Sequence, residues 1–130
     1  MSERILLVED NPDNMKLLRW TLEDAGYEYE CATTAEEAME TLERMSFELV
    51  LMDISLPGMS GKAATRKIRN DAKLKNLPVI AVTAHAILEE ESAIWDSGVN
   101  DVVTKPIDET TLLNAIRRSL SSEAPEAANG

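Results

Sequence analysis

Short runs of apolar residues alternate along this chain with longer segments in which apolar positions recur every three or four residues. Apolar and polar positions do not alternate within the short runs, which indicates strands buried on both faces, as in a parallel sheet covered by helices. The predicted strands are Arg4–Glu9, Tyr27–Ala32, Phe47–Asp53, Pro78–Thr83 and Asp101–Thr104. The predicted helices are Asn14–Asp24, Ala35–Arg44, Gly61–Asp71, Leu88–Ser97 and Glu109–Leu120.

Residues that favour helix ends stand between the predicted elements. Gly26 and Gly98 each follow a helix, where a left-handed C-terminal cap favours glycine. Thr34 and Glu37 have the spacing of a capping box at the start of the second helix, and Asp108 suits the N-cap of the last one. These residues support the alternation that the apolar pattern predicts.

Five repeats of strand and helix predict an α/β fold of (βα)5 type. We expect a doubly wound, parallel five-stranded sheet with helices on both faces and right-handed crossovers. The strand Tyr27–Ala32 is the most polar, so we expect it at a sheet edge. A length of 130 residues suits one domain, which we assign to residues 1–120. Residues 121–130, SSEAPEAANG, are mostly small and polar, which predicts a disordered C-terminal tail.

The chain is strongly acidic. It carries 13 basic and 24 acidic residues, a net charge of −11, and its isoelectric point is near 4.5. This charge disfavours nucleic acid and anionic membranes, because binding to both depends largely on lysine and arginine meeting phosphates. It suits a divalent cation or a basic partner, although a solvated acidic surface accounts for most of the acids.

The only cysteine is Cys31, which excludes an internal disulfide and a thiolate zinc site. It lies in a predicted strand, and we expect it to be a small buried hydrophobic side chain. The first residues, MSERILLVED, contain no secretory apolar region, and no apolar run approaches the length of about 18 residues that a membrane helix needs. We therefore expect the protein in the reducing cytoplasm.

Four of the predicted strands lead into residues that can carry out chemistry. The first leads into Glu9 and Asp10, the third ends in Asp53, the fourth ends in Thr83, and Lys105 follows the fifth. The carboxyl ends of parallel strands lie along one edge, and in open α/β sheets ligands bind at that edge where the strand order reverses. We therefore expect three carboxylates, a hydroxyl and an ammonium to converge there.

Three neighbouring carboxylates resist full ionisation, and a hard divalent cation relieves their repulsion. Mg²⁺ suits this site because it binds one or two carboxylates and retains waters and phosphate oxygens as further ligands. Asp53 beside such a metal suits a phosphoryl acceptor that forms an aspartyl phosphate. Lys105, the Thr83 hydroxyl and nearby backbone amides would offset the negative charge. The alternative is that Asp53 is a strand-end carboxylate that caps a loop.

Four segments of the chain resemble the signature segments of response-regulator receiver domains of two-component signalling. They are LVEDN, LVLMDISLPGMSG, VIAVTAHA and VVTKPI, and they occur in the family's order. The resemblance extends from Arg4 to Leu120 and is closest to single-domain regulators of the chemotaxis and cell-cycle type. It implies the flavodoxin-like receiver fold, with strand order 2-1-3-4-5.

The resemblance also implies roles for matching residues. Asp53 would accept a phosphoryl group from a phosphohistidine on a sensor kinase or a phosphotransfer protein. Asp10 would bind Mg²⁺ directly, Glu9 directly or through water, and the backbone carbonyl of Ser55 would be a third protein ligand. In this reading Asp53 is at once the acceptor and part of the metal site.

Further implied contacts lie at the ends of the last two strands. Thr83, Lys105 and the backbone amide of Ala84 would contact the phosphoryl group, and the peptide bond before Pro106 would be cis. Many receivers carry Phe or Tyr three residues before the lysine, and this ring swings inward on phosphorylation. Val102 stands at that position here, so an aromatic flip cannot occur and the route of output transmission stays open.

His85 stands two residues after Thr83, where side chains in the family influence the access of water to the phosphoryl group. A lone histidine is more often a surface or loop residue. We therefore expect His85 to have no direct chemical role, and we do not expect it to be a phosphohistidine.

Two tryptophans are candidates for partner surfaces. On the first predicted helix the inward stripe is Met15, Leu18, Leu22 and Ala25. At about 100° per residue, Trp20 falls on the side of the helix roughly opposite to this stripe. Tryptophan is enriched at the centres of protein interfaces. Because the first helix of receivers commonly docks on the kinase or phosphotransfer partner, we hypothesise that Trp20, flanked by Leu17, contacts that partner. The alternative is a ring that lies flat over neighbouring side chains.

Trp95 lies on the flank of the fourth predicted helix, near the face that many receivers use for output or dimerisation. We hypothesise that it belongs to a homodimer or effector surface. The acidic residues 89–91 before it suit a solvated first turn, which is favourable near a helix N-terminus.

The sequence thus predicts a single-domain response regulator that signals by phosphorylation-dependent protein binding or acts in a relay. It would assist its own phosphorylation and dephosphorylation but have no separate substrate. A Mg²⁺-dependent phosphatase is the first alternative, but Ser55 stands where such enzymes carry a second acid. A nucleotide-binding module lacks support because no G-x-G-x-x-G or P-loop occurs. A receiver cut from a larger kinase or transcription factor is less favoured, because the chain begins with Met and ends in a polar tail.

Overall fold

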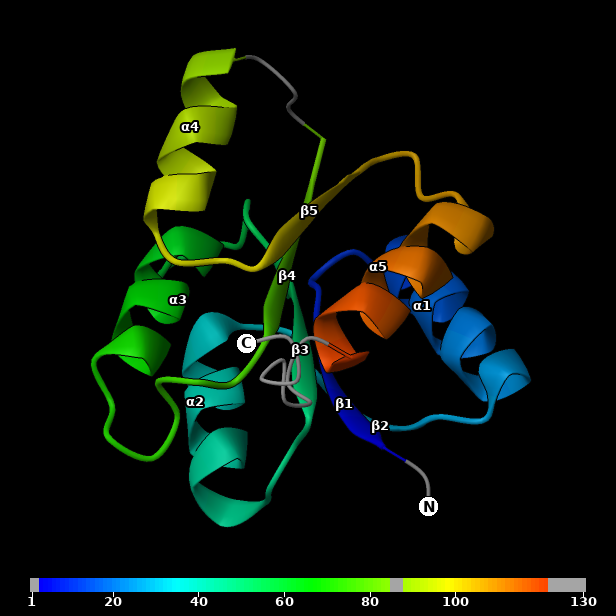
Figure 1. The fold of residues 1–130 in the computed structure, drawn as a ribbon, viewed down its shortest axis with the longest axis horizontal. Coiled ribbons are helices and arrows are strands. Elements are labelled where there is room, and N and C mark those ends of the chain that lie inside the picture. Colours follow the sequence, from blue (N-terminus) through cyan, green and yellow to red (C-terminus); the bar gives the residue numbers. More distant parts are fainter. Residues whose placement is uncertain (1–2, 85–87, 122–130) are drawn as a thin grey trace.

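The computed structural model describes residues 3–84 and 88–121 of the chain. Five parallel strands form one sheet in the order β2-β1-β3-β4-β5, as predicted (Figure 1). The strands are β1 (Arg4–Val8), β2 (Glu28–Ala32), β3 (Leu49–Asp53), β4 (Val79–Thr83) and β5 (Asp101–Thr104). The helices are α1 (Pro12–Ala25), α2 (Ala35–Arg44), α3 (Gly61–Arg69), α4 (Leu88–Asp96) and α5 (Glu109–Ser121). His85 and residues 122–130, the bulk of the predicted tail, lie outside the described residues.

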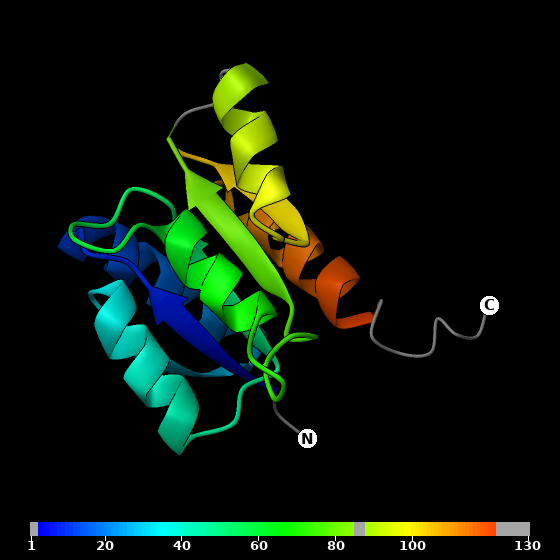
Figure 2. The same cartoon turned by 90° about the vertical axis from the view of Figure 1, so that its left-hand side faces the viewer.

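Helices cover both faces of the sheet. Helices α2, α3 and α4 lie on one face, and α1 and α5 lie on the other (Figure 1, Figure 2). Each helix connects two parallel strands or follows the last one, so the chain winds in both directions from the centre of the sheet. The strand order reverses between β1 and β3, which are paired neighbours. The carboxyl ends of these two strands therefore flank the position where ligands bind in folds of this class.

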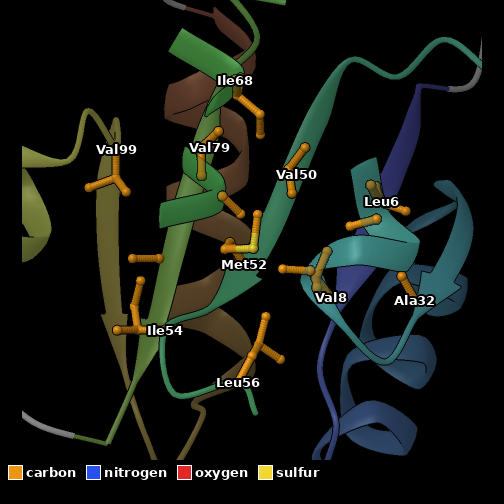
Figure 3. Packing of buried hydrophobic residues seen from close by; sticks show 14 of the residues in the cluster. Leu6, Val8, Ala32, Val50, Met52, Ile54, Leu56, Ile68, Val79 and Val99 are labelled. Carbon is orange, nitrogen blue, oxygen red and sulfur yellow. The ribbon is translucent and has the colours of Figure 1, made fainter. Parts of the chain in front are cut away.

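The core consists of two apolar layers, one on each face of the sheet. Alternate residues of each central strand enter opposite layers, so every residue of β3 and β4 is buried although the sequence shows no alternation. One layer contains Leu6, Val50 and Met52 together with residues of α2, α3 and α4 (Figure 3). The other layer contains Ile5, Leu49 and Leu51 together with residues of α1 and α5. Burial on both faces fixes the register of the strands, and with it the position of every strand end.

Helix α1 begins two residues before its predicted start. The side chain of Asn11 accepts hydrogen bonds from the backbone N–H groups of Asp13 and Asn14, and Pro12 occupies the first helical position. The apolar periodicity starts only at Met15, so it underestimates the length of the helix at its N-terminal end. At the other end Gly26 has φ of 86° and forms the predicted left-handed cap.

Helix α2 has the predicted N-cap with a small difference in its partners. The Thr34 hydroxyl accepts from the Glu37 N–H at 3.0 Å. The Glu37 carboxylate reaches back to the N–H of Thr33, not to that of Thr34, at 2.8 Å. Asp108 likewise accepts from the Thr111 N–H at the start of α5, as expected for a cap.

Strand β2 lies at the sheet edge, as its polar composition predicts, and this position corrects the expectation for Cys31. The Cys31 side chain is exposed, not buried. An edge strand has a neighbour on one side only, so its side chains reach solvent past the covering helices. Only Ala32 of this strand is buried. Within the described residues no helix is both long enough and apolar enough to cross a membrane.

Candidate functional site

The candidate site lies at the carboxyl ends of the strands, where parallel pairing places four ends side by side. Val8 at the end of β1 pairs with Met52, which directly precedes Asp53. Asp53 pairs with Val82, the residue before Thr83, and Thr83 pairs with Thr104. The residues that follow or end these strands therefore meet at one edge, as the sequence predicts.

Three carboxylates gather at this edge. Glu9, Asp10 and Asp53 each place one carboxylate oxygen so that all three oxygens lie within 4.8 Å of one another. Glu9 and Asp53 are buried, whereas Asp10 is exposed. Oxygen atoms of carboxylates are the preferred ligands of hard divalent cations, and an exposed member leaves room for waters. The donor set thus fits Mg²⁺.

Asp53 is held from two sides. Its Oδ1 atom accepts a hydrogen bond from the backbone N–H of Ser55 at 3.0 Å and lies 3.6 Å from the Lys105 ammonium. Its backbone is fixed as well, because the N–H of Ile54 donates to the Val82 carbonyl at 3.1 Å and so extends the pairing with β4. The side chain is almost wholly buried, so both contacts act in surroundings that contain little water.

One carboxylate oxygen of Glu9 is buried without a hydrogen bond from the described residues. Its Oε2 atom accepts from the Asn11 N–H at 3.2 Å. Its Oε1 atom is buried, lies 3.4 Å from the Lys105 ammonium, and has no hydrogen-bond donor within the described part of the chain. Burial raises the pKa of the Glu9 carboxyl, the charge of Asp53 raises this pKa further, and Lys105 partly opposes both effects. A buried acceptor oxygen without a donor, beside a second carboxylate, is the environment that a bound cation would relieve.

Lys105 reaches the cluster from the loop after β5. Its backbone N–H donates to the Thr83 carbonyl at 2.8 Å, which ties that loop to the end of β4. The peptide bond between Lys105 and Pro106 is cis, as the resemblance implied. Thr83 itself is buried at the end of β4, and Ala84, which follows it, is exposed. Ser55 is also exposed, so solvent reaches the residues that follow Asp53 and Thr83.

Gly61, the first residue of α3, contributes in a way that sequence reasoning missed. Its N–H donates to the Ile54 carbonyl at 3.1 Å. A Cβ atom on Gly61 would stand 2.2 Å from the Asp53 carbonyl oxygen and 2.8 Å from the Ile54 Cα atom, so only glycine fits. The sequence signal for this close approach was a glycine at the first position of a predicted helix, where glycine is rarely required.

The candidate partner residues lie apart from this cluster. The exposed fraction of Trp20 on α1 is 54%, and that of Trp95 on α4 is 43%. Leu17 is half-buried, and the Lys16 ammonium lies 5.7 Å from the centre of the Trp20 ring. Val102 is half-buried and packs against the core layer beneath α4. The exposure expected for Trp20 is therefore confirmed.

Comparison with known proteins identifies a family model and several relatives that match most of this chain. The family model of the response regulator receiver domain matches residues 5–117. The sensor protein GacS of Pseudomonas syringae pv. syringae is 38% identical over 133 residues, which cover 97% of this chain but 15% of GacS. The polar-differentiation response regulator DivK of Brucella ovis is 37% identical over 120 residues, which cover 92% of this chain and 98% of DivK.

A solved structure of similar architecture is the receiver domain of sensor histidine kinase PA1611 from Pseudomonas aeruginosa PAO1. It superimposes with a TM-score of 0.87 at 33% identity, covering 94% of this chain and 100% of that domain. That crystal structure holds a magnesium ion coordinated in its active site cleft. The chain thus spans a small part of GacS but almost the full length of DivK and of this solved receiver domain.

Proposed function

Because this chain belongs to the response-regulator receiver-domain family, we propose that it is a single-domain response regulator that accepts a phosphoryl group on Asp53 with Mg²⁺ as cofactor. The donor is a phosphohistidine of a sensor histidine kinase or a histidine phosphotransfer protein. One observation carries the proposal: the buried Asp53 carboxylate lies in one cluster with Glu9 and Asp10, and the Lys105 ammonium is 3.6 Å from its Oδ1 atom.

In the metal site, Asp10, Asp53 and the Ser55 backbone carbonyl would hold Mg²⁺ directly, with Glu9 as a direct or water-mediated ligand. The bound ion supplies positive charge next to the transferred phosphoryl group. The Oε1 atom of Glu9 supports this assignment, because among the described residues this buried oxygen accepts no hydrogen bond and has only the Lys105 ammonium, 3.4 Å away, as an ion-pair partner.

In the transfer, an Asp53 carboxylate oxygen forms a bond to phosphorus while the bond between phosphorus and the donor imidazole nitrogen breaks. The imidazole leaves with the bonding electron pair and takes up a proton. Lys105 already lies within 3.6 Å of Asp53, so its cation is positioned to offset charge on the phosphoryl oxygens. The Thr83 hydroxyl and the Ala84 backbone N–H would donate to the same oxygens. The chain thus assists a reaction on its own side chain and has no separate substrate.

The chemistry is tested with a small phosphodonor, which removes the need for a kinase. The purified protein is incubated with acetyl phosphate and Mg²⁺ and weighed by intact-mass spectrometry. We expect one phosphoryl adduct, lost when Mg²⁺ is chelated and absent in Asp53→Asn. Asp24→Asn, which neutralises an exposed acid on α1, is the matched control and should be modified like the wild type. An adduct that persists in Asp53→Asn would overturn the assignment of the acceptor.

The partner surface that we propose for phosphoryl transfer is the exposed side of α1 around Trp20 and Leu17. Support comes from the exposed fraction of Trp20, which is high for so large an apolar side chain. Trp20→Ala should slow transfer from the phosphohistidine donor but leave modification by acetyl phosphate unchanged. Trp95→Ala, an equally large truncation on another helix, is the control and should not affect transfer. Equal transfer rates in the wild type and Trp20→Ala would refute the surface.

For output we propose the face that includes Trp95 on α4, as a surface for a downstream protein or a second copy of the chain. Phosphorylation makes Asp53 larger and more negative, and Thr83 and Lys105 reorganise around it and bias this face between two states. With Val102 at the usual aromatic position, that bias does not pass through an aromatic flip. A change in Trp95 fluorescence or in oligomeric mass after phosphorylation supports this surface. A phosphorylated monomer with unchanged Trp95 fluorescence counts against it.

We place this exchange in the cytoplasm, where sensor kinases have access to ATP. A single thiol that stands exposed on strand β2 is compatible with a reducing compartment.

A further inference from the structure

The connection between β3 and α3, residues 54–60, carries the Ser55 carbonyl and lies directly beside the acceptor. Its inner side is firmly fixed. The Ile54 N–H donates to Val82, the Ile54 carbonyl accepts from Gly61, and the side chains of Ile54 and Leu56 are buried. The inner side therefore moves only if the sheet or the core moves with it.

The outer side of this connection has a different kind of support. Pro57 and Gly58 are exposed, so the core does not hold them. The Glu36 carboxylate extends from the first turn of α2, and its Oε2 atom accepts from the Met59 N–H at 3.4 Å. The same carboxylate lies over Gly58, since a Cβ atom there would be 3.5 Å from Oε2 and 3.8 Å from Oε1. The hydrogen bond to Met59 and the proximity to Gly58 thus place the Glu36 carboxylate against the outer side.

Glu36 is itself fixed to the other flank of the metal site. It belongs to the first turn of α2, which is capped by the hydrogen bond from Glu37 N–H to Thr34. That turn begins two residues after β2, and the carbonyl of Ala32 at the end of β2 accepts from the Glu9 N–H at 3.0 Å. A short chain of backbone contacts therefore connects Glu9 with the base of the Glu36 side chain.

We propose that Glu36 is a positioning residue that holds the loop 54–60 in the conformation required for metal binding. It links the loop that carries the Ser55 carbonyl to the strand end that carries Glu9, so the two flanks of the metal site keep their spacing. The inference rests on the proposed role of the Ser55 carbonyl as a Mg²⁺ ligand. The acceptor oxygen of Glu36, not its charge, performs this role.

Three variants of the full chain separate positioning from charge. Glu36→Ala removes both the acceptor and the charge, and Glu36→Gln removes the charge but keeps a carbonyl oxygen within reach of the Met59 N–H. Glu40→Ala removes an equally charged, exposed side chain from the same helix. Isothermal titration gives the Kd for Mg²⁺ in each unphosphorylated variant. Amide hydrogen exchange of residues 54–60 is measured in metal-free protein.

We expect Glu36→Ala to bind Mg²⁺ about threefold to fivefold more weakly than the wild type, the effect of one exposed hydrogen bond. The amides of residues 54–60 should exchange faster by a similar factor. Glu36→Gln and Glu40→Ala should resemble the wild type in both measurements. A wild-type Kd in Glu36→Ala, or an equal loss in Glu36→Gln, would overturn the proposal.

The outcome for Glu36 is separable from that of the proposed function. If the Mg²⁺ affinities follow the expected order but the wild type takes up no phosphoryl group, the positioning role stands and the phosphoacceptor assignment fails. If the wild type is phosphorylated on Asp53 and Glu36→Ala binds Mg²⁺ normally, the function stands and the positioning role fails.

Discussion

Gly61 approaches the backbone of Asp53 so closely that a methyl group on Gly61 would stand 2.2 Å from the Asp53 carbonyl oxygen. Cβ atoms in folded proteins essentially never lie so close to an oxygen. The contacted atom belongs to the backbone of Asp53, so it cannot move away by a rotamer change. The hydrogen bond from the Gly61 N–H to the Ile54 carbonyl holds the start of α3 against the residue that follows the proposed acceptor. Any side chain on residue 61 must displace the start of α3 or the end of β3.

Gly61→Ala should therefore lower the free energy of unfolding by about 1–3 kcal/mol, the usual cost of overpacking. Urea unfolding checks this value. Where the protein stays folded, modification by acetyl phosphate should also fall, because Asp53 is shifted relative to Glu9 and Lys105. Gly26→Ala is the control: it has open space around its Cβ position but a φ of 86°, so it should cost about 1–2 kcal/mol without affecting modification. Normal modification of Gly61→Ala would show that the displacement spares Asp53.

The raised pKa of Glu9 predicts a pH-dependent stability in metal-free protein. A carboxyl whose folded-state pKa is raised contributes stability that is present below its ordinary pKa and is lost as pH rises through the folded value. The wild type loses that contribution as pH rises, whereas Glu9→Gln has no carboxyl at this position and therefore no such contribution to lose. In EDTA at pH 7, Glu9→Gln should melt at a higher temperature than the wild type, by about 3–5 °C for each kcal/mol gained.

The difference between Glu9→Gln and the wild type should shrink as pH falls towards the ordinary glutamate pKa of 4.5. Adding Mg²⁺ at pH 7 should reverse the order, since a ligand that binds only the folded state stabilises the protein that binds it more tightly. A pH series of thermal melts, with and without the metal, measures both effects. A wild type more stable than Glu9→Gln in EDTA at pH 7 would contradict the assigned direction of the pKa shift.

Lys105 is predicted to serve phosphoryl transfer and not metal binding. Its ammonium lies 3.4 Å from Glu9 and 3.6 Å from Asp53, so it repels a cation at the same carboxylates. Lys105→Met should reduce the rate of modification by acetyl phosphate about 100-fold or more, the usual effect of losing one charge-stabilising donor. Its Kd for Mg²⁺ should stay unchanged or decrease. Lys67→Met, which removes an exposed lysine on α3, is the control. Loss of Mg²⁺ binding in Lys105→Met would point to a structural role.

Arg69, the last residue of α3, is predicted to be a polar support for the connection between α4 and β5 and for the loop before β4. Its guanidinium donates to the carbonyls of Gly98 at 2.8 Å, Leu77 at 2.7 Å and Lys75 at 3.1 Å, and to the Asn100 side chain at 2.8 Å. Desolvation by burial lowers the pKa of this guanidinium, which stays protonated at neutral pH. Its charge-assisted hydrogen bonds therefore persist across the physiological range.

Arg69→Met should lower the free energy of unfolding by about 3 kcal/mol, because several acceptors lose a charged donor at once. Arg69→Lys should recover only part of this loss, since one ammonium cannot reach all four acceptors. Arg66→Met, on an exposed position of the same helix, should change the stability by less than about 0.5 kcal/mol. Chemical unfolding of the three variants gives the comparison, and full recovery by lysine would show that a single contact suffices.

Much of the fold follows from local features of the chain. Apolar runs without alternation predict β1, β3 and β4, and the sequence places their carboxyl ends within one residue of where the structure has them. The helix starts at Thr34 and Asp108 follow from single capping residues. The early start of α1 at Pro12 was missed, because Asn11 acts through a hydrogen bond that apolar periodicity does not report. The burial expected for Cys31 was wrong, because exposure depends on what covers an edge strand.

The sequence by itself determined the alternation of elements and the acids, hydroxyl and lysine at strand ends, because each depends on residue type and short-range spacing. The tertiary structure decided how these groups meet. Only strand register brings Asp53 beside Lys105, and only a close crossing of backbones makes Gly61 obligatory. The contact of Glu36 with the loop beyond Asp53 joins residues more than 20 positions apart, so no local pattern encodes it. Distances between residues remote in sequence are set by packing, which the chain specifies only as a whole.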